Sequence, residues 1–336
     1  MNKVTNASIQ KQAMCPTPRV VIVGGSGFVG TRLITLLKET GRYDLLNVDI
    51  AESQTHPDIT QKGDVRRLFD MLEAFRGVDT VILLAAQHRD DVRPTSLYYE
   101  TNVNGMRNVL KAMSQQNVRR LIFFSSVAVY GLNKPHPDEH ADPDPANEYG
   151  RSKWQAEKVL RQWHGRHPEK SVTVVRPTVI FGEGNRGNVY NLLLQIQSGR
   201  FMMVGSGKNP KSMAYVGNVA AFVRHILEKD EPGHRIYNYA DKPDYDMNAL
   251  VRLTGETLGK HIPSMHVPQW LGMLGGCCFD VLGFITRHRF AISAQRVRKF
   301  CAVTQFPADR AQATGFAPPF TIDEGLRRTL HFEFGN

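Results

Sequence analysis

The sequence predicts an α/β protein built on a doubly wound parallel sheet, with a smaller lobe formed by the C-terminal part of the chain. Strand-like and helix-like segments alternate through the first half. The strand-like segments are continuous apolar runs, as is typical of strands that helices cover on both faces of a parallel sheet. A glycine-rich turn joins the first strand to the first helix. The 336-residue chain is 41% hydrophobic and 22% charged, which is the composition of a folded globular protein.

The alternation sets the order of the expected elements. We expect strands at residues 19–25, 44–49, 80–86, 119–127 and 171–180. We expect helices at residues 28–39, 64–75, 96–116 and 149–164. Such an order indicates successive βαβ units. After Gly182 the pattern becomes irregular, with a helix-like run within 185–207, a strand end and helix at 214–229, and a return to the main sheet at 235–241.

The glycine-rich turn predicts a dinucleotide site. Gly24, Gly27 and Gly30 form a G-x-x-G-x-x-G pattern where the first strand turns into a helix. There the backbone can approach a pyrophosphate, and the helix N-terminus offers free N–H groups and the positive end of its dipole. Asp49 ends the second strand, where a carboxylate accepts hydrogen bonds from both ribose hydroxyls and repels a 2′-phosphate. The sequence therefore predicts a Rossmann-type site for NAD, favoured over NADP.

These elements divide the chain into a leader, a cofactor domain and a lobe. We expect residues 1–18 to be a flexible leader and 19–184 to form the NAD-binding Rossmann domain, with later returns near 212–241. Residues 185–211 and 242–336 would form a substrate-binding lobe. In such folds ligands bind at the carboxyl edge of the sheet, so the lobe should lie over that edge.

The charge and the N-terminus limit the partners. Forty-two Lys and Arg against 32 Asp and Glu give a net charge of +10. The basic residues are mostly scattered, and the densest group is Arg287, Arg289, Arg296, Arg298 and Lys299. No recognised nucleic-acid-binding module accompanies them, so we expect no nucleic-acid partner. The N-terminus lacks the apolar core of a signal peptide, which predicts a cytoplasmic protein.

Two further features concern cysteine and the membrane. The four cysteines show no metal-ligand spacing and are too few for a disulfide framework, so we expect no metal site. The adjacent Cys277 and Cys278 are expected to be small core residues. Residues 267–286 are apolar but contain Asp280 and a Gly-Gly pair, which argues against a transmembrane span. We expect a buried or surface-covering helix there, with peripheral membrane contact as the alternative.

A serine, a tyrosine and a lysine form a candidate catalytic group. Ser126 lies at the end of the fourth expected strand, and Tyr149 and Lys153 share one helix face because they are four residues apart. A phenol titrates near pH 10, and a neighbouring ammonium favours its phenolate, so Lys153 would bring Tyr149 closer to neutral pH. Ser126 would hold the substrate oxygen against Tyr149.

Together these motifs resemble the extended short-chain dehydrogenase/reductases, of the NAD-dependent epimerase/dehydratase kind. The resemblance runs from Arg19 to about Arg328 and includes GGSGFVG, GDV at 63–65, LLAA at 83–86, SSVAVYG, YGRSK and RPTVIFG at 176–182. It implies an enzyme with Ser126, Tyr149 and Lys153 as the catalytic triad. It implies cofactor contacts from Gly24, Gly27, Phe28, Val29, Gly30, Asp49, Asp64, Val65, Ala85, Ala86, Asn102, Tyr149 and Lys153. It also implies that Arg176 and Pro177 lead the chain into the substrate lobe, and that the helices at 96–116 and 149–164 pair in a homodimer.

The resemblance further implies a nucleotide-sugar substrate and a role in polysaccharide biosynthesis. Asn188 and Lys211 stand where the family places contacts to the nucleotide diphosphate, and Arg287 or Arg289 would serve the same phosphates. His88 lies in a loop that departs from the sugar-epimerase pattern and is either a substrate contact or a structural residue. Ser126 would also touch the substrate.

The residues after Ser126 restrict the reaction. Family dehydratases carry an Asp-Glu pair there, whereas this chain has Val127 and Ala128, which cannot transfer protons. A dehydratase is therefore disfavoured. Because Asp49 favours NAD, which an epimerase recycles in place, we favour epimerisation at C4 of a UDP-sugar through a transient 4-keto intermediate. A nucleotide-sugar 4-keto reductase and a hydroxysteroid-type dehydrogenase remain the alternatives. A non-catalytic NAD-sensing regulator is disfavoured because Tyr149 and Lys153 are both present.

Overall fold

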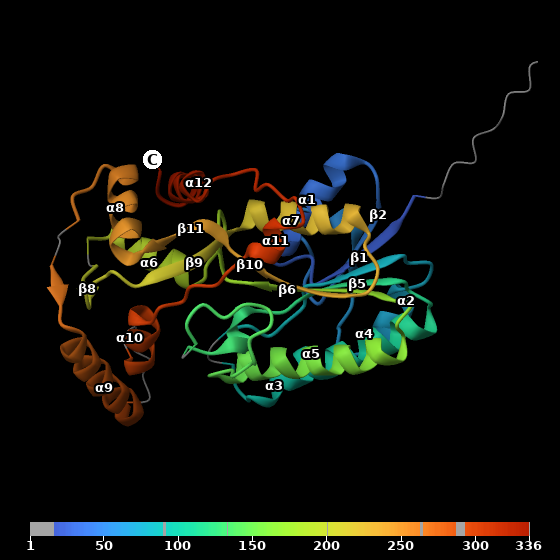
Figure 1. The fold of residues 1–336 in the computed structure, drawn as a ribbon, viewed down its shortest axis with the longest axis horizontal. Helices are drawn as coiled ribbons and strands as arrows, with labels where there is room; N and C mark the ends of the chain where they lie inside the picture. The colour runs from blue at the N-terminus through green and yellow to red at the C-terminus, as the bar shows by residue number, and fades with distance from the viewer. Residues whose placement is uncertain are drawn as a thin grey trace, which may run out of the picture.

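A seven-stranded parallel sheet forms the centre of the protein (Figure 1). The computed structural model describes residues 17–89, 92–132, 134–199, 201–262, 265–286 and 293–335. The strands are β1 (Arg19–Val23), β2 (Asp44–Asp49), β3 (Thr60–Lys62), β4 (Thr80–Leu83), β5 (Arg120–Phe124), β6 (Ser171–Pro177) and β10 (His234–Tyr239). They lie in the order β10-β6-β5-β4-β1-β2-β3, and all neighbours are parallel. The order in which the chain adds strands reverses at β1, because β2 and β3 lie on one side of it and β4, β5 and β6 on the other. Such folds bind ligands at this switch point.

Helices cover both faces of this sheet, which confirms the expected fold class. On one face α1 (Phe28–Thr40) packs against α7 (Val216–Lys229). On the other face α4 (Gly105–Gln115) packs against α2 (Leu68–Ala74) and α5 (Glu148–Arg166). The central strands β1, β4 and β5 therefore bury side chains on both sides, which explains why their sequences are apolar runs rather than alternating patterns.

The C-terminal lobe is built on a second, smaller sheet. Its strands β7 (Val179–Phe181), β9 (Pro210–Tyr215) and β11 (Asp241–Asp246) lie in the order β11-β9-β7, and β8 (Met203–Val204) pairs with β12 (His266–Val267). The helices of this part are α6 (Asn188–Gln197), α8 (Met247–Leu258), α9 (Gln269–Thr286), α10 (Ala294–Cys301), α11 (Asp309–Gln312) and α12 (Ile322–Phe334). Side chains of α6, α8 and α12 share one apolar core with β9.

Several expected elements differ in the structure, and the helix expected at 64–75 begins only at Leu68. The run at 171–180 is two strands, because the chain leaves the main sheet after Pro177 and β7 pairs with β9 instead. The run at 96–116 is not one helix: α3 (Ser96–Tyr99) leads into a π-helical segment (Glu100–Asn104) before α4 begins. The helix expected within 185–207 ends at Gln197, shortly before Gly199 takes a positive φ of 70°. Segments of π-helix are often found at functional sites.

The apolar segment at 267–286 forms α9 on the surface of the lobe. Cys277 and Cys278 are exposed on it, so the expectation that they are core residues is wrong. Several of the large apolar side chains of α9 are exposed as well, because the helix buries a different face against the lobe.

Candidate active site

Close backbone packing explains two glycines of the turn between β1 and α1. Gly24 has a φ of +89°, and a Cβ there would lie 2.5 Å from the backbone nitrogen of Ala85. A Cβ on Gly30 would lie 2.4 Å from the Cα of Gly25, so α1 can approach the turn only with glycine at this position. Gly27 is the N-cap of α1 and has no side-chain cap. The turn therefore leaves a helix N-terminus bordered by backbone alone, which suits a pyrophosphate.

The next two residues of α1 contribute differently. The side chains of Phe28 and Val29 pack against the apolar core of the C-terminal lobe. A cofactor at the helix N-terminus would therefore meet the backbone N–H groups of these two residues. Their predicted role in cofactor binding therefore depends on N–H groups rather than on side chains.

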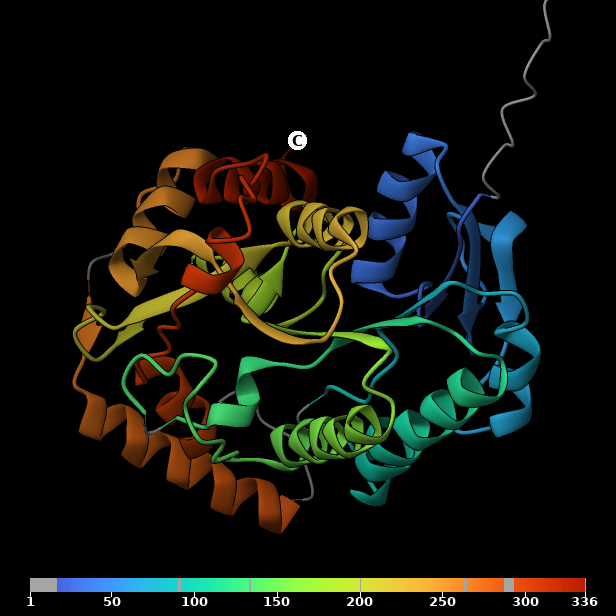
Figure 2. The ribbon, with the colours of Figure 1, turned by 45° about the vertical axis from the view of Figure 1, so that its right-hand side comes forward.

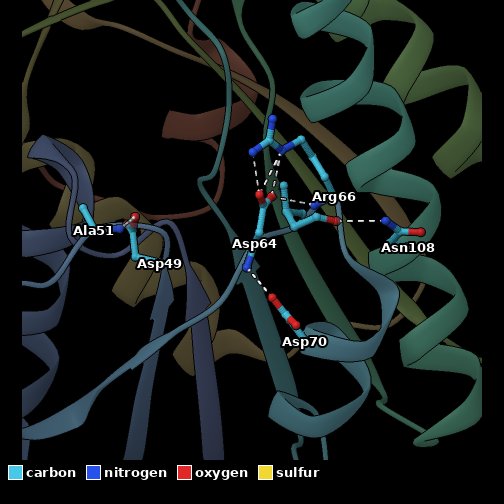
Figure 3. A network of polar contacts seen from close by, with 7 residues as sticks. Asp49, Ala51, Asp64, Arg66, Asp70 and Asn108 are labelled. Carbon is cyan, nitrogen blue, oxygen red and sulfur yellow. Dashed lines mark hydrogen bonds and ion pairs between the residues drawn. The ribbon is translucent and has the colours of Figure 1, made fainter.

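Asp49 lies at the end of β2, beside the glycine turn. Its carboxylate accepts hydrogen bonds from the backbone N–H of Ser26 (2.9 Å) and of Ala51 (3.1 Å; Figure 3). These two bonds fix the carboxylate at the carboxyl end of the sheet, and each oxygen keeps a lone pair for a ribose hydroxyl. This placement fits the predicted preference for NAD.

Asp64 and Val65 follow β3, and Figure 3 shows Asp64 to the side of Asp49 at the carboxyl end of the sheet. The Asp64 carboxylate pairs with the Arg66 guanidinium, whose hydrogen bonds hold the pKa of that carboxyl below its usual range. The Asp64 N–H donates to Asp70, and Asn108 donates to the Val65 carbonyl at 3.1 Å. The side chain of Asp64, a predicted cofactor contact, is thus already paired with Arg66.

The three candidate catalytic residues come from two neighbouring elements. Ser126 follows β5, and its Oγ accepts a hydrogen bond from the Ala128 N–H at 3.1 Å, which leaves the hydroxyl proton to be donated. Tyr149 is half-buried in the first turn of α5, and Lys153 lies one turn further on. The Lys153 Nζ donates to the Phe124 carbonyl at 2.7 Å, immediately before the serines. Burial lowers the pKa of Lys153 to about 7, with Glu157 opposing the shift.

A buried ion pair underlies Lys153, and the sequence analysis missed it. Glu157 and Arg176 are each 2% exposed and joined by two hydrogen bonds, one of 2.9 Å from the Arg176 Nε. Arg176 also donates to the Tyr130 hydroxyl at 2.5 Å, and Ser125 donates to Glu157. The signal was present in the sequence: Glu157 follows Lys153 by four residues, so both lie on one face of α5. Arg176 thus ties α5 to the end of β6.

Asn102 holds the loop that follows β4, and His88 is part of that loop. Asn102, in the π-helical segment, donates to the Gln87 carbonyl (3.0 Å) and to Ser152 (2.8 Å), and accepts from the Gln87 N–H (2.9 Å). It therefore ties the loop that contains Ala85 and Ala86 to α5. His88 is exposed, yet partial desolvation lowers the pKa of its ring; a backbone hydrogen bond at Ala86 opposes this shift, and the charges of Lys153 and Arg89 add to it.

The predicted diphosphate contacts lie in the lobe. Asn188 is the exposed first residue of α6. Lys211 instead donates to the carbonyls of Lys299 (2.9 Å) and Ala302 (2.6 Å) at the end of α10, and burial lowers its pKa to about 8. These contacts do not support a diphosphate role for Lys211, which stays a prediction. Arg287 and Arg289 lie outside the described residues.

The arrangement fits NAD. The glycine turn, the N-terminus of α1 and Asp49 meet at the switch point of the sheet, and Ser126, Tyr149 and Lys153 follow the neighbouring strand β5. A hydroxyl held between Ser126 and Tyr149 would be placed to exchange its proton, since a phenol beside an ammonium is a suitable acid or base.

Comparison with known proteins identifies the family. The model of the NAD-dependent epimerase/dehydratase family matches residues 20–240. The chain is 56% identical over 317 residues to the N-acetyl-alpha-D-glucosaminyl-diphospho-ditrans,octacis-undecaprenol 4-epimerase of Escherichia coli O157:H7, covering 94% of this chain and 95% of that protein. It is 26% identical to the UDP-glucose 4-epimerase of Vibrio cholerae over 92% of this chain and 94% of that one.

Solved structures agree on the fold. The UDP-glucose 4-epimerase of Thermus thermophilus, in complex with NAD, superposes with a TM-score of 0.72 at 21% identity, covering 94% of this chain and 98% of that one. The glycine turn, the sheet order and these matches lead to one conclusion. The chain belongs to the NAD-dependent epimerase/dehydratase family and is an NAD-dependent sugar epimerase of the extended short-chain dehydrogenase/reductase type.

Proposed function

We propose that the protein interconverts the C4 epimers of an N-acetylhexosamine that is linked through a diphosphate to a polyprenol. The C4 chemistry is supported by the complete group of Ser126, Tyr149 and Lys153. Directly after Ser126, Val127 and Ala128 stand in place of the acids that would transfer protons in a dehydratase. The support for a lipid-linked substrate is the 56% identity to a relative named for such a substrate.

The side chains divide the work of oxidation and reduction at C4. Tyr149 accepts the proton of the 4-hydroxyl, and the charge of Lys153 favours the phenolate that this requires. Ser126 donates its hydroxyl proton to the same substrate oxygen and so fixes that oxygen against Tyr149. NAD, when bound, supplies the acceptor and donor of hydride. After the transient 4-keto sugar turns over in the site, C4 receives the hydride back on its other face, and Tyr149 returns the proton to the 4-oxygen.

A UDP-sugar is the second candidate substrate. It shares the sugar and the diphosphate with a polyprenyl diphosphate sugar, and the relative from Vibrio cholerae is named for UDP-glucose. The two candidates therefore differ only in what lies beyond the second phosphate. Asn188, at the exposed start of α6, is the proposed contact to this shared diphosphate.

The test is a direct comparison of substrates. NAD-loaded protein is incubated, without added reductant, with a short-chain polyprenyl diphosphate N-acetylglucosamine, with UDP-N-acetylglucosamine and with UDP-glucose. We expect the galacto epimer of the polyprenyl substrate and no net change in NADH absorbance, with Tyr149→Phe as the inactive control.

Other outcomes would select an alternative. Faster conversion of a UDP-sugar would overturn the lipid assignment and leave the C4 chemistry intact. Consumption of reduced cofactor with a 4-keto sugar, and with no other substrate, would indicate a reductase. Turnover of a hydroxysteroid alone would overturn the sugar assignment.

A further inference from the structure

Helix α9 presents its bulky apolar side chains to solvent rather than to the protein. Trp270, Leu274 and Val281 are 68%, 56% and 60% exposed. Leu271 and Leu282 are exposed on the same helix, as are Cys277 and Cys278. At 3.6 residues per turn, these seven positions fall within about 140° of the helix circumference and extend for about 18 Å. We call this stripe, formed by Trp270, Leu271, Leu274, Cys277, Cys278, Val281 and Leu282, the α9 face.

The opposite side of α9 is the side that packs against the lobe. A Cβ on Gly272 would lie 2.5 Å from Val204 of β8, and a Cβ on Gly276 would lie 2.7 Å from the backbone nitrogen of Ala294. Asp280, one turn further on, accepts a hydrogen bond from the Ala294 N–H at 3.0 Å. The two glycines therefore face the protein, Asp280 is exposed but bonds to α10 at its edge, and the tryptophan, leucines and valine face outward. This is the reverse of an ordinary amphipathic surface helix.

Positive charge is concentrated near α9 in the sequence and on the neighbouring helix α10. Between residues 265 and 302 the sequence contains five Arg and Lys, at 287, 289, 296, 298 and 299, and one acid, Asp280. Arg296 and Arg298 are exposed on α10, which packs beside α9 at the outer edge of the lobe (Figure 1 and Figure 2). An apolar stripe that contains tryptophan and is flanked by Arg and Lys is typical of helices that lie in the interface of an anionic bilayer.

We propose that the α9 face docks on the surface of an anionic lipid bilayer, with α9 lying in the plane of the interface. Within the parts of the chain that the structure describes, no helix has the length and apolar character that crossing a membrane requires. A second copy of the chain is a poorer occupant, because it would bring the same positive charge against this surface. The purpose of docking rests on the proposed function, since a polyprenyl diphosphate substrate is anchored in a bilayer.

Vesicle binding tests the surface separately from the reaction. NAD-loaded wild-type protein is sedimented with vesicles of phosphatidylcholine containing phosphatidylglycerol, and with vesicles of phosphatidylcholine alone. We expect stronger binding to the anionic vesicles, weakened by salt. The double variant Trp270→Glu/Leu274→Glu should bind at least about tenfold more weakly.

A matched control separates this surface from a general effect of charge. The double variant Phe69→Glu/Phe332→Glu adds the same two charges at residues that are 70% and 65% exposed on α2 and α12, and it should bind like the wild type. The conservative variant Trp270→Phe/Leu274→Met should keep binding, which guards against a folding defect. All variants should turn over a water-soluble short-chain substrate at the wild-type rate.

Three results would overturn the proposal. In the first, the wild-type protein does not bind anionic vesicles. In the second, Trp270→Glu/Leu274→Glu binds them as strongly as the wild type. In the third, the wild type is a dimer that does not bind vesicles, and the same variant converts it to a monomer. The third would assign the face to a second copy. None of these results bears on the proposed function, which is judged by turnover of the soluble substrate. Failure of membrane docking and failure of the proposed function are therefore distinguishable.

Discussion

Replacing Lys153 by methionine tests both the catalytic role and the burial of this side chain. Methionine keeps much of the volume but removes the ammonium that donates to the Phe124 carbonyl and supports Tyr149. We expect turnover to fall by about 10²- to 10⁴-fold, because the phenol loses its charge partner. The more distinctive expectation concerns stability, since burial lowers the pKa of Lys153 to about 7.

The magnitude follows from the difference in pKa between the folded and unfolded chain. In the unfolded chain the lysine titrates near its ordinary value of 10.5, so between pH 7 and 10.5 the unfolded state binds more protons than the folded one. The free energy of unfolding of the wild type therefore rises with pH in this window. Below pH 7 the buried ammonium costs about 5 kcal/mol, and at pH 9 the remaining cost is about 2 kcal/mol.

Urea unfolding at pH 6 and pH 9 measures this difference. The free energy of unfolding of the wild type, relative to Lys153→Met, should rise by about 2–3 kcal/mol from pH 6 to pH 9. Groups that titrate elsewhere in the protein are common to both proteins and cancel in the comparison. A difference that stays constant across this range would show that Lys153 is not desolvated as the structure indicates.

Three further predictions concern the hydroxyl, the cofactor and the assembly. Tyr149→Phe should lower turnover by about 10²- to 10⁴-fold while calorimetry shows NAD binding unchanged, and near-normal turnover would contradict its role in proton transfer. Asp49→Ala should weaken NAD binding and relax the discrimination against NADP, since it removes both the ribose acceptor and the repelling charge; tighter binding of NADP than NAD by the wild type would refute this interpretation. Light scattering at micromolar concentration should give the mass of a homodimer paired through residues 96–116 and 149–164, and a monomeric mass would count against that pairing.

Local features of the sequence determined the cofactor end of the molecule. The strand, the glycine turn and the helix at residues 19–40 are contiguous, so their spacing alone predicts how closely the backbones must pack. The position of Gly30 against Gly25 agrees with that prediction, whereas the contact of Gly24 with Ala85 joins β1 to the loop after β4. The four-residue spacing of Tyr149 and Lys153 likewise places both on one face of α5 whatever the rest of the chain does.

Only the tertiary structure decided the partners that come from distant parts of the chain. The ion pair of Glu157 and Arg176 joins a helix to a strand, and the carbonyls that hold Lys211 lie about 90 residues away, at Lys299 and Ala302. A side chain forms such contacts only when separate elements pack together, and no spacing within one element encodes them.

The α9 helix shows the same limit most clearly. Its apolar composition predicted a helix, but composition does not say which face a neighbour will bury. Gly272 and Gly276 allow β8 and the start of α10 to approach closely, so the small side of α9 is buried and the bulky apolar side is left facing solvent. The sequence by itself determined the cofactor turn and the catalytic spacing, because both are local. The exposed face of α9 was decided by packing between segments far apart in the chain, because burial depends on which surfaces meet.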